Sequence, residues 1–513
     1  ADATINSITV GKGANSVAGN TVLGETALDA SVSGGHNTAI GKDALTALTS
    51  GASNVAVGSA ALDANTTASF NVGVGFSSLG ANTTGDRNVA LGYEAMFTNT
   101  VGDRSVAIGM QALYTQNPAS NADMNNIAIG HAAAFSTTTG TNNTAIGTSA
   151  LFANTSGTNG VAVGKDALLS NTTGAQNTAV GTSSLDANTT GQFNVALGQS
   201  ALGGNSTGSN NTGLGRGAME ANTTASNNTA VGYNTLAANT TGTQNVAVGA
   251  FALDANTTAN NNTVVGYNAL SANTTGTANT AIGTAALNAN STADNNTGVG
   301  MNALLVNTTG TPNTAVGSFS LQSNTTGDAN TALGSSALQE NTTGSNNTAL
   351  GRSALILNTT GFQNVAVGTF TLDAITTGNS CTGVGYAALS ANTANNCSAF
   401  GTNALIANTS GVDNNAFGAA SLAANTTGLR NQAFGVSSLQ SNTTGEGNNS
   451  FGYAALSANT TADNNSAFGH NALLANTTGT ENSAVGAFAL DANTTGIRNI
   501  AVGTGALGAN TTA

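Results

Sequence analysis

Few side chains in this 513-residue sequence are of the types that perform acid–base, metal or nucleophilic chemistry. Its three histidines, His36, His131 and His470, are too widely scattered for a metal site or a catalytic triad. Charged residues make up 6% of the chain, against ~25% in a typical soluble domain. No strand, GxxxxGK[ST] loop and helix occur together, so the glycines do not form a phosphate-binding motif. We therefore predict no enzyme activity, no cofactor and no metal site.

The charge balance narrows the range of partners. Nine Lys and Arg against 22 Asp and Glu give a net charge of −13, which argues against nucleic-acid binding through phosphate contacts. No apolar run approaches the ~20 residues of a membrane-spanning helix. We expect neither nucleic acid nor membrane insertion.

Tyrosine is the one residue type whose placement suggests ligand binding. Five of the six tyrosines directly follow a recurring glycine: Tyr93, Tyr233, Tyr267, Tyr386 and Tyr453. A row of these rings could stack on the sugar rings of a surface glycan. The alternative, which we weight more heavily, is a solvated face that keeps a weakly charged protein in solution.

The remaining residues that could be chemically modified are two cysteines and the asparagines of a recurring Asn-Thr-Thr motif. Cys381 and Cys397 each lie four residues before a recurring glycine, so they are expected on adjacent repeats, either as a disulfide or as two free thiols. Asn-Thr-Thr matches the N-glycosylation pattern. Because glycans on repeats ~5 Å apart would collide, we expect stacked asparagine amides to form a ladder instead.

The elements that position these residues come from one internal repeat. Twenty-nine glycines between Gly24 and Gly503 mark it, and 26 of the 28 intervals are 17 residues long; one is 21 and one is 16. We number the positions 0 to 16 from this glycine, and the repeat reads G-x-x-A-L-x-A-N-T-T-G-x-x-N-T-A-V. Position 0 is always glycine, which indicates either close backbone contact or a positive φ. Examples of these structural glycines are Gly41, Gly58, Gly75, Gly266 and Gly283.

The pattern within the repeat predicts a parallel β-solenoid of about 29 coils. Positions 13–16 alternate between polar, small and bulky residues, as in a strand, and Asn-Thr-Thr-Gly is typical of a turn. We expect two short strands per coil, with Leu at position 4 and the large residue at position 16 pointing inward and stacking from coil to coil. Five consecutive phenylalanines at position 16 would then fill the core, which we favour over the alternative of a local binding feature: Phe400, Phe417, Phe434, Phe451 and Phe468. At ~4.8 Å per coil the array would form a rod of about 140 Å.

Irregularities in the period divide the chain. Residues 1–23 break the repeat and are predicted to be a cap or a join, and residues 24–513 form one continuous array. The long interval carries a four-residue insertion within 110–129, where a loop containing Tyr114 and Pro118 is expected to protrude, as a recognition loop or as a tolerated insertion. The absence of an initial Met fits a processed chain or a fragment, and the end at Ala513 in mid-repeat leads us to expect a further domain, chain or segment beyond it.

The sequence motifs NTAVG, AL and NTTG resemble the head repeats of trimeric autotransporter adhesins. The longer unit, as in residues 229–250, is similar to the repeat arrays of phage tail fibres, and the likeness covers residues 24–513. The resemblance implies a homotrimer on a virion or bacterial surface that takes part in attachment, with host-cell glycans or a receptor as partner. Small residues at positions 15 and 0 would then allow close approach of chains near an axis. The period of 17, against about 14 in adhesin heads, is a departure that puts the shape of the coil in doubt.

Three hypotheses of function follow. The first is a non-enzymatic extracellular fibre, a stiff and trimeric rod that spaces or presents an attachment site. The second is a filament subunit that stacks head to tail. The third is an ice-binding solenoid, which is disfavoured because the Thr pair lies in a turn and not in a flat T-x-T strand.

Overall fold

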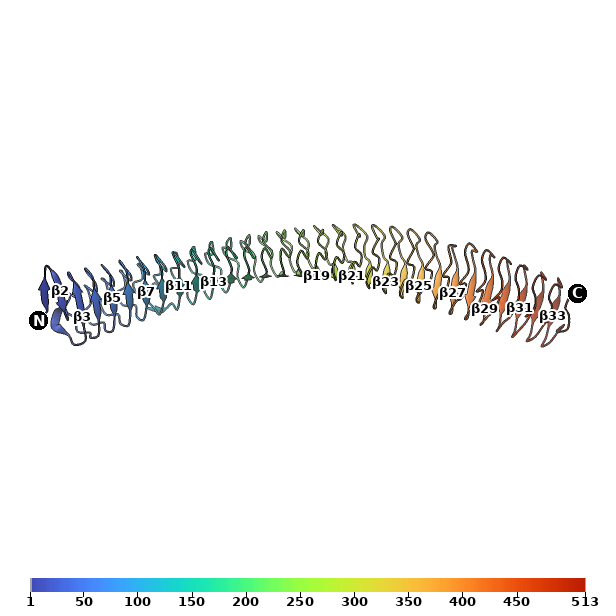
Figure 1. Cartoon of the computed structure of the whole chain (residues 1–513), viewed down its shortest axis with the longest axis horizontal. Helices are drawn as coiled ribbons and strands as arrows, with labels where there is room; N and C mark the ends of the chain where they lie inside the picture. Colours follow the sequence, from blue (N-terminus) through green and yellow to red (C-terminus); the bar gives the residue numbers. More distant parts are fainter. Residues whose placement is uncertain (1, 513) are drawn as a thin grey trace. The chain divides into compact units, whose positions relative to one another are not determined.

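The computed structural model describes residues 2–512, which fold as an all-β parallel solenoid with a 17-residue repeat, as predicted. Its one helical element is a 3-10 turn, η1 (Ala14–Ser16). The chain forms two compact units, Ala1–Asn260 and Asn261–Ala513, and each is a stack of coils in chain order (Figure 1).

Each coil contributes one strand of three or four residues, which ends at or next to position 16. In the first unit these strands are β3 (Thr21–Gly24), β4 (Thr38–Ile40), β5 (Val55–Val57), β6 (Val72–Val74), β7 (Val89–Leu91), β9 (Val106–Ile108), β11 (Ile127–Ile129), β12 (Thr144–Ile146), β13 (Val161–Val163), β14 (Thr178–Val180), β15 (Val195–Leu197), β16 (Thr212–Leu214), β17 (Thr229–Val231) and β18 (Val246–Val248). In the second unit they are β19 (Thr263–Val265), β20 (Thr280–Ile282), β21 (Thr297–Val299), β22 (Thr314–Val316), β23 (Thr331–Leu333), β24 (Thr348–Leu350), β25 (Val365–Val367), β26 (Thr382–Val384), β27 (Ser398–Phe400), β28 (Asn415–Phe417), β29 (Gln432–Phe434), β30 (Asn449–Phe451), β31 (Ser466–Phe468), β32 (Ser483–Val485) and β33 (Ile500–Val502).

Neighbouring strands within a unit pair in parallel, with equivalent positions aligned. Thr229 of β17, for example, pairs with Val246 of β18. Apart from the short strands β8 (Gly102–Asp103) and β10 (Ala122–Asp123), the expected second strand of each coil is not present in the described residues. The segment after position 0 is a series of turns, yet its backbone also bonds between coils, as when Leu168 N donates to Ser184 O at 3.0 Å. The prediction of two strands per coil was wrong because this segment does not keep the extended backbone that a strand requires.

The amino-terminal segment forms a hairpin against the first coil. β1 (Ala3–Ile5) pairs antiparallel with β2 (Ile8–Gly11), and β2 pairs antiparallel with β3. β3 pairs in parallel with β4, so it is already a strand of the array. The solenoid therefore begins a few residues before the boundary expected at residue 24.

The core contains small side chains from the strands and leucines from the turns. Position 15 is buried in every coil, as in Ala90, Ala230 and Ala416, and Leu at position 4 is buried in every coil that has it except the last, where Leu507 is exposed. Because side chains alternate along a strand, positions 14 and 16 face outward. The prediction that position 16 points inward was therefore wrong, and so was the prediction that Phe400, Phe417, Phe434, Phe451 and Phe468 fill the core. The interior is narrow: a Cβ added at Gly73, a position-15 glycine, would lie 3.3 Å from the Leu62 side chain.

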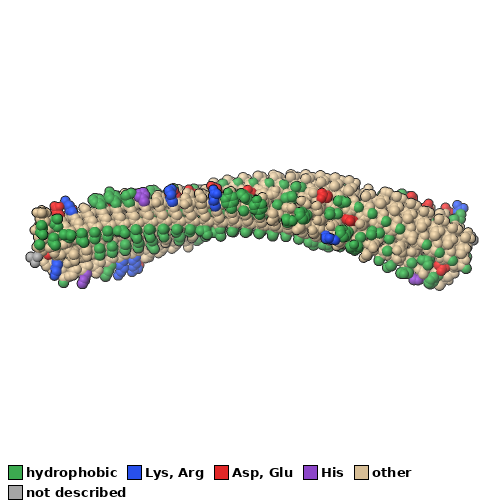
Figure 2. Space-filling model, viewed as in Figure 1, with side chains coloured by type: hydrophobic (Ala, Val, Ile, Leu, Met, Phe, Trp, Pro, Cys, Tyr) green, Lys and Arg blue, Asp and Glu red, His purple; other side chains and the backbone are tan. Residues whose placement is uncertain are grey.

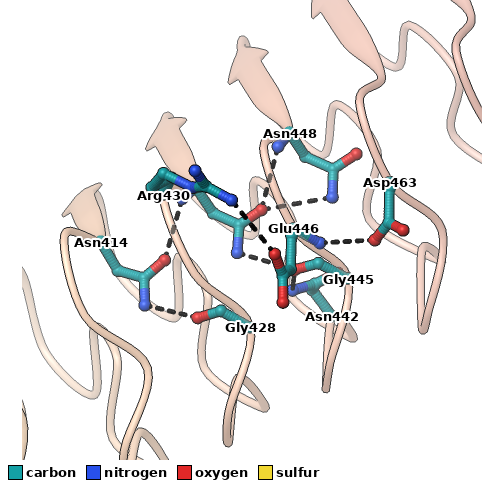
Figure 3. A network of polar contacts seen from close by, with 9 residues as sticks. Asn414, Gly428, Arg430, Asn442, Gly445, Glu446, Asn448 and Asp463 are labelled. Carbon is teal, nitrogen blue, oxygen red and sulfur yellow. Dashed lines mark hydrogen bonds and ion pairs between the residues drawn. The ribbon is translucent and has the colours of Figure 1, made fainter.

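Two columns of asparagine complete the core, at positions 7 and 13. Asn414 Nδ2 donates to Gly428 O at 2.7 Å, and Asn431 N donates to Asn414 Oδ1 at 2.9 Å (Figure 3). The carbonyl of Gly445 accepts from both columns, from Asn442 Nδ2 at 3.0 Å and Asn431 Nδ2 at 2.8 Å. The stacked amides therefore satisfy backbone groups that the narrow coil would otherwise bury without partners.

The glycine at position 0 meets both conditions that its invariance indicated. Gly283 has a φ of +130°, and a Cβ there would lie 2.6 Å from the carbonyl oxygen of Gly300. Positive φ values also recur at positions 2, 4 and 12 in residues other than glycine, including Leu236 at +53°. The Asn-Thr-Thr-Gly turns contain no residue with a positive φ among the described coils.

Candidate interaction surface

The outer face of the sheet carries two columns of large side chains, at positions 14 and 16. In β15, Val195 is 38% exposed and Leu197 is 50% exposed, while Ala196 between them is buried. Aliphatic residues occupy position 16 of successive strands throughout the first unit. Figure 2 shows hydrophobic side chains aligned in rows along this unit. The face thus presents an uncharged apolar strip, the kind of surface that proteins usually cover with a partner.

The second unit divides this face into two parts. From β19 to β24, position 14 is threonine and position 16 is Val, Ile or Leu, so hydroxyl and aliphatic columns run side by side. From β27 to β31, position 16 is phenylalanine and position 14 is Ser, Asn or Gln. We call Phe400, Phe417, Phe434, Phe451 and Phe468 the phenylalanine face.

The rings of the phenylalanine face form a continuous stack. Neighbouring ring centroids lie 4.6 to 4.8 Å apart, with interplanar angles of 3° to 8°. The polar column beside them is bonded in part, since Asn415 Nδ2 donates to Gln432 Oε1 at 2.8 Å. The column lies on the outside of the coil: Phe468 at the end of the stack is 41% exposed, and the other four rings are partly exposed.

A second aromatic stack lies at position 5 in the first unit, and the sequence analysis missed it. Tyr114 lies between Phe97 and Phe135 with centroids 5.6 and 5.0 Å away, and Phe152 continues the stack at 5.2 Å. Assigning every aromatic residue to its repeat position, across the long interval, would have found these four.

The inserted segment is smaller than expected. Tyr114 belongs to the stack at position 5 and Pro118 is buried, so neither side chain protrudes. Residues 119–121 are an exposed run, after which β10 (Ala122–Asp123) pairs in parallel with β8 (Gly102–Asp103). A short added strand pair therefore absorbs most of the extra length.

The five tyrosines at position 1 are exposed by 41% to 56%, but no two of them lie on consecutive coils. Their described ring contacts are with other residues of neighbouring coils: Tyr93 stacks on Phe76 at 5.5 Å, and Tyr453 stacks on His470 at 5.2 Å. Tyr386 meets Phe370 edge-on at 6.3 Å. Tyr233 and Tyr267 also lie at position 1, in the first and second unit respectively. The structure therefore does not bring the tyrosines together into one platform.

Cys381 and Cys397 are both buried as free thiols. Each replaces the asparagine of position 13 and takes over its bond to the next coil: Cys381 Sγ donates to Ala394 O and Cys397 Sγ to Gly411 O, both at 3.2 Å. A hydrogen bond with the Cys381 thiol, and then burial, raise the pKa of Cys397, which keeps it protonated. The pair therefore acts as part of the hydrogen-bonded column.

The side chains of the Asn-Thr-Thr motifs are hydrogen-bonded within the stack of coils. The asparagines at position 7, such as Asn188, are buried, and Asn188 Nδ2 donates to Asn171 Oδ1 at 2.8 Å. The threonine at position 8 is also engaged, since Thr172 Oγ1 donates to Thr189 O at 3.0 Å. This arrangement is the ladder that was expected, and it leaves these asparagines inaccessible to glycosylation in the folded chain.

Half-buried carboxylates at position 5 have raised pKa values. Burial raises the pKa of Asp63, Asp186 and Asp254, which occupy position 5. A hydrogen bond with Glu94 raises the pKa of Tyr93. Residues 2–512 hold no group of three or more His, Cys, Asp or Glu side chains placed to bind a metal ion. None of the elements described there is a helix long and apolar enough to cross a membrane.

Comparisons with known proteins identified no relative of this chain. No known protein family matches the chain, and the curated proteins include none that is significantly similar in sequence. The interaction surface is thus defined by its geometry alone: an uncharged outer face of aliphatic, threonine and phenylalanine columns on a backbone that repeats every 17 residues.

Proposed function

We propose that this chain is a non-enzymatic structural fibre segment that works outside the cell, on a virion or a bacterial surface, where it spaces or presents an attachment site. The observation that carries the proposal is the outer face of the sheet. Large apolar side chains occupy position 16 on successive strands of each unit, while the smaller residue at position 15 fills the interior. Such a division suits a scaffold whose outer columns contact other chains.

The proposed partner of this face is further copies of the same chain, in a homotrimer. Identical strips repeat at the same spacing on every copy, so columns of one chain can pack against columns of another over many coils. The uncharged character of positions 14 and 16 removes the repulsion that a net charge of −13 would otherwise bring to a self-contact.

The test is the mass of the purified chain, measured by mass photometry over a range of concentrations. We expect discrete trimers. A variant carrying Val74→Glu, Leu91→Glu and Ile108→Glu on the outer face should dissociate, whereas the matched triple variant Phe76→Glu, Tyr93→Glu and Met110→Glu, at the exposed position 1, should not. A wild-type chain that stays monomeric would overturn the proposed assembly.

A head-to-tail filament is distinguished by the same measurement. Trimers reach a fixed mass, whereas a filament grows continuously with concentration in light scattering. Glutamates on the outer face would leave such growth intact, because the contacts would be made at the ends of the stack.

Ice binding is a second candidate, which the threonine column of the second unit favours. Thr263, Thr280 and the equivalent residues up to Thr348 lie on the outer face beside an aliphatic column, which is the flat arrangement that the Asn-Thr-Thr turns cannot provide. Thermal hysteresis of the wild-type chain that is lost on Thr297→Lys and Thr314→Lys would support it. Absence of hysteresis in the wild-type chain would remove it.

A further inference from the structure

The outward positions around Gly217, in the first unit, form a hollow of about 270 Å³. Its sides come from position 1 of three successive coils, which carry Gln199, Arg216 and Tyr233. Its floor comes from position 2, where Gly217 lies between Ser200 and Asn234. The volume is close to ~300 Å³, the lower end of small-molecule sites, and suits one ring better than a chain of rings.

Gly217 is the reason that the hollow exists. Other coils carry Ala, Ser, Asp, Asn, Phe or a similar residue at position 2, and the one other glycine there is Gly505 in the last coil. A Cβ on Gly217 would lie 2.5 Å from Asn234 Oδ1 and 3.4 Å from Glu220 Oε2. An amide and a carboxylate therefore converge on the space that the missing side chain leaves.

Arg216 and Tyr233 form the wall of the hollow. The Arg216 Cζ lies 5.7 Å from the centre of the Tyr233 ring, and Phe251 supports that ring edge-on at 5.2 Å with an interplanar angle of 88°. Among the residues that the structure describes, Arg216 takes part in no ion pair, unlike Arg104, Arg430 and Arg498. Its guanidinium donors are thus free to meet a ligand, and an aromatic ring lies beside them.

We infer that this hollow binds a neutral pyranose, as a residue of a surface glycan. The inference rests on the proposed attachment role and names its ligand class. Gln199 and Asn234 each offer both donors and acceptors, Ser200 offers a hydroxyl, Arg216 donates and Glu220 accepts, which suits adjacent sugar hydroxyls. Tyr233 lines the hollow and holds the Arg216 guanidinium over its ring, so the site is polar and would recognise the sugar through its hydroxyls.

The local charge favours a neutral sugar over an acidic one. Asp186 lies close enough to Glu220 and Asp166 for their charges to act on it. Asp166 in turn is paired with Lys165. Of the residues that line the hollow only Arg216 and Glu220 are charged, one of each sign, and Asp186 adds negative charge near Glu220, so a uronic or sialic acid meets no surplus of positive charge.

The test is saturation-transfer NMR on the full chain, with methyl β-glucoside and N-acetylglucosamine as probes and glucuronic acid as the acidic comparison. We expect binding of at least one neutral probe, weakened tenfold or more by Tyr233→Ala and by Gly217→Asn. Asparagine occupies position 2 at Asn268 and Asn302 with a positive φ, so the second variant fills the hollow while keeping the backbone. Tyr386→Ala is the matched control, because Tyr386 also lies at position 1 with a phenylalanine edge-on, and it should bind as the wild type does.

Three results would overturn the inference: no binding of either neutral probe, equal loss in the Tyr386 variant, or preference for glucuronic acid. Thermal melts of each variant separate loss of the site from loss of the fold. Mass photometry of the same variants keeps the proposed function distinct, because the trimer would persist in a chain whose hollow binds nothing, and a sugar-binding monomer would contradict the assembly alone.

Discussion

The outer face differs between β5–β7 in the first unit and β27–β31 in the second, although the backbone and the inner column are alike. Over β5–β7 both outward positions are aliphatic, from Val55 to Leu91, and we call this the aliphatic face. Over β27–β31 one outward column is stacked phenylalanine and the other is polar. Position 15 is buried and small in both. The interior residues therefore determine the shape of the coil, whereas the residue types on the outer face can differ from region to region.

The largest effect should come from the invariant backbone contact, and it should be equal in both regions. Gly75→Val and Gly401→Val would each push a Cβ into the next glycine of the stack, 2.6 Å from Gly418 in the second case, at a φ above +130°. We expect each to lower the free energy of unfolding by ~4 kcal/mol or more, measured by urea unfolding. The control is Gly428→Ala, since position 10 is naturally alanine at Ala68 and Ala225. A tolerated valine in either region would show that the two backbones differ.

The second-largest loss of stability should come from substitutions in the buried column at position 15, and it should again be equal in both regions. Ala90→Leu and Ala416→Leu overpack an interior that is fully buried at both sites, and we expect losses of ~1–3 kcal/mol. Val264, a buried residue at the same position, marks the largest side chain that the described coils hold there. Unchanged unfolding of either leucine variant would contradict the narrow interior.

Substitutions in the outward column at position 16 should destabilise the two regions to different extents. Phe434→Ala removes a ring stacked between Phe417 and Phe451 and should cost ~1 kcal/mol beyond its lost surface. Leu91→Ala removes a 44% exposed side chain without ring stacking and should cost less. The comparison is made under conditions in which the chain is monomeric, so that assembly does not contribute. Equal losses would mean that the phenylalanine stack adds nothing to the coil.

The smallest expected effect is a pH dependence of the stability of the first unit. Because burial raises the folded-state pKa of Asp63 and Asp254 above 3.8, the unfolded chain ionises first as the pH rises. Stability should therefore fall as the pH passes upward from about 3.8 to the raised pKa, and the loss should persist above it. Asp63→Asn and Asp254→Asn should remove this dependence, with a gain at neutral pH of at most ~0.5 kcal/mol each because the groups are partly screened by solvent. Melts that show rising stability over that interval would contradict the assignment.

The sequence predicted the repeat, the parallel stacking and the buried leucines, because 17-residue spacing and invariant glycine leave few other solutions. It could not predict which way the strand faces. Alternation alone allows either set of side chains to point inward, and hydrophobicity favoured the bulky residue of position 16. The choice is made by the interior, where Leu at position 4 and two asparagine columns leave room for side chains no larger than valine at position 15.

The candidate sites were less accessible to sequence reasoning. The tyrosines at position 1 were found, but their separation along the stack and their pairing with rings such as Phe76 depend on three-dimensional contacts. The hollow at Gly217 depends on one missing side chain at an outward position, a signal that position-by-position comparison of the coils could have revealed. Tyr114 was assigned to the inserted loop because the long interval hid its place in the position-5 stack.

The most direct test of the account is a cryo-electron microscopy map of the purified chain at side-chain detail. The orientation of each strand can be read in such a map whatever the number of chains in the particle. We predict that density for Val, Leu and Phe at position 16 projects away from the coil, while leucine at position 4 and alanine at position 15 lie inside. Position-16 side chains found within the coil, or a coil that does not repeat every 17 residues, would contradict it.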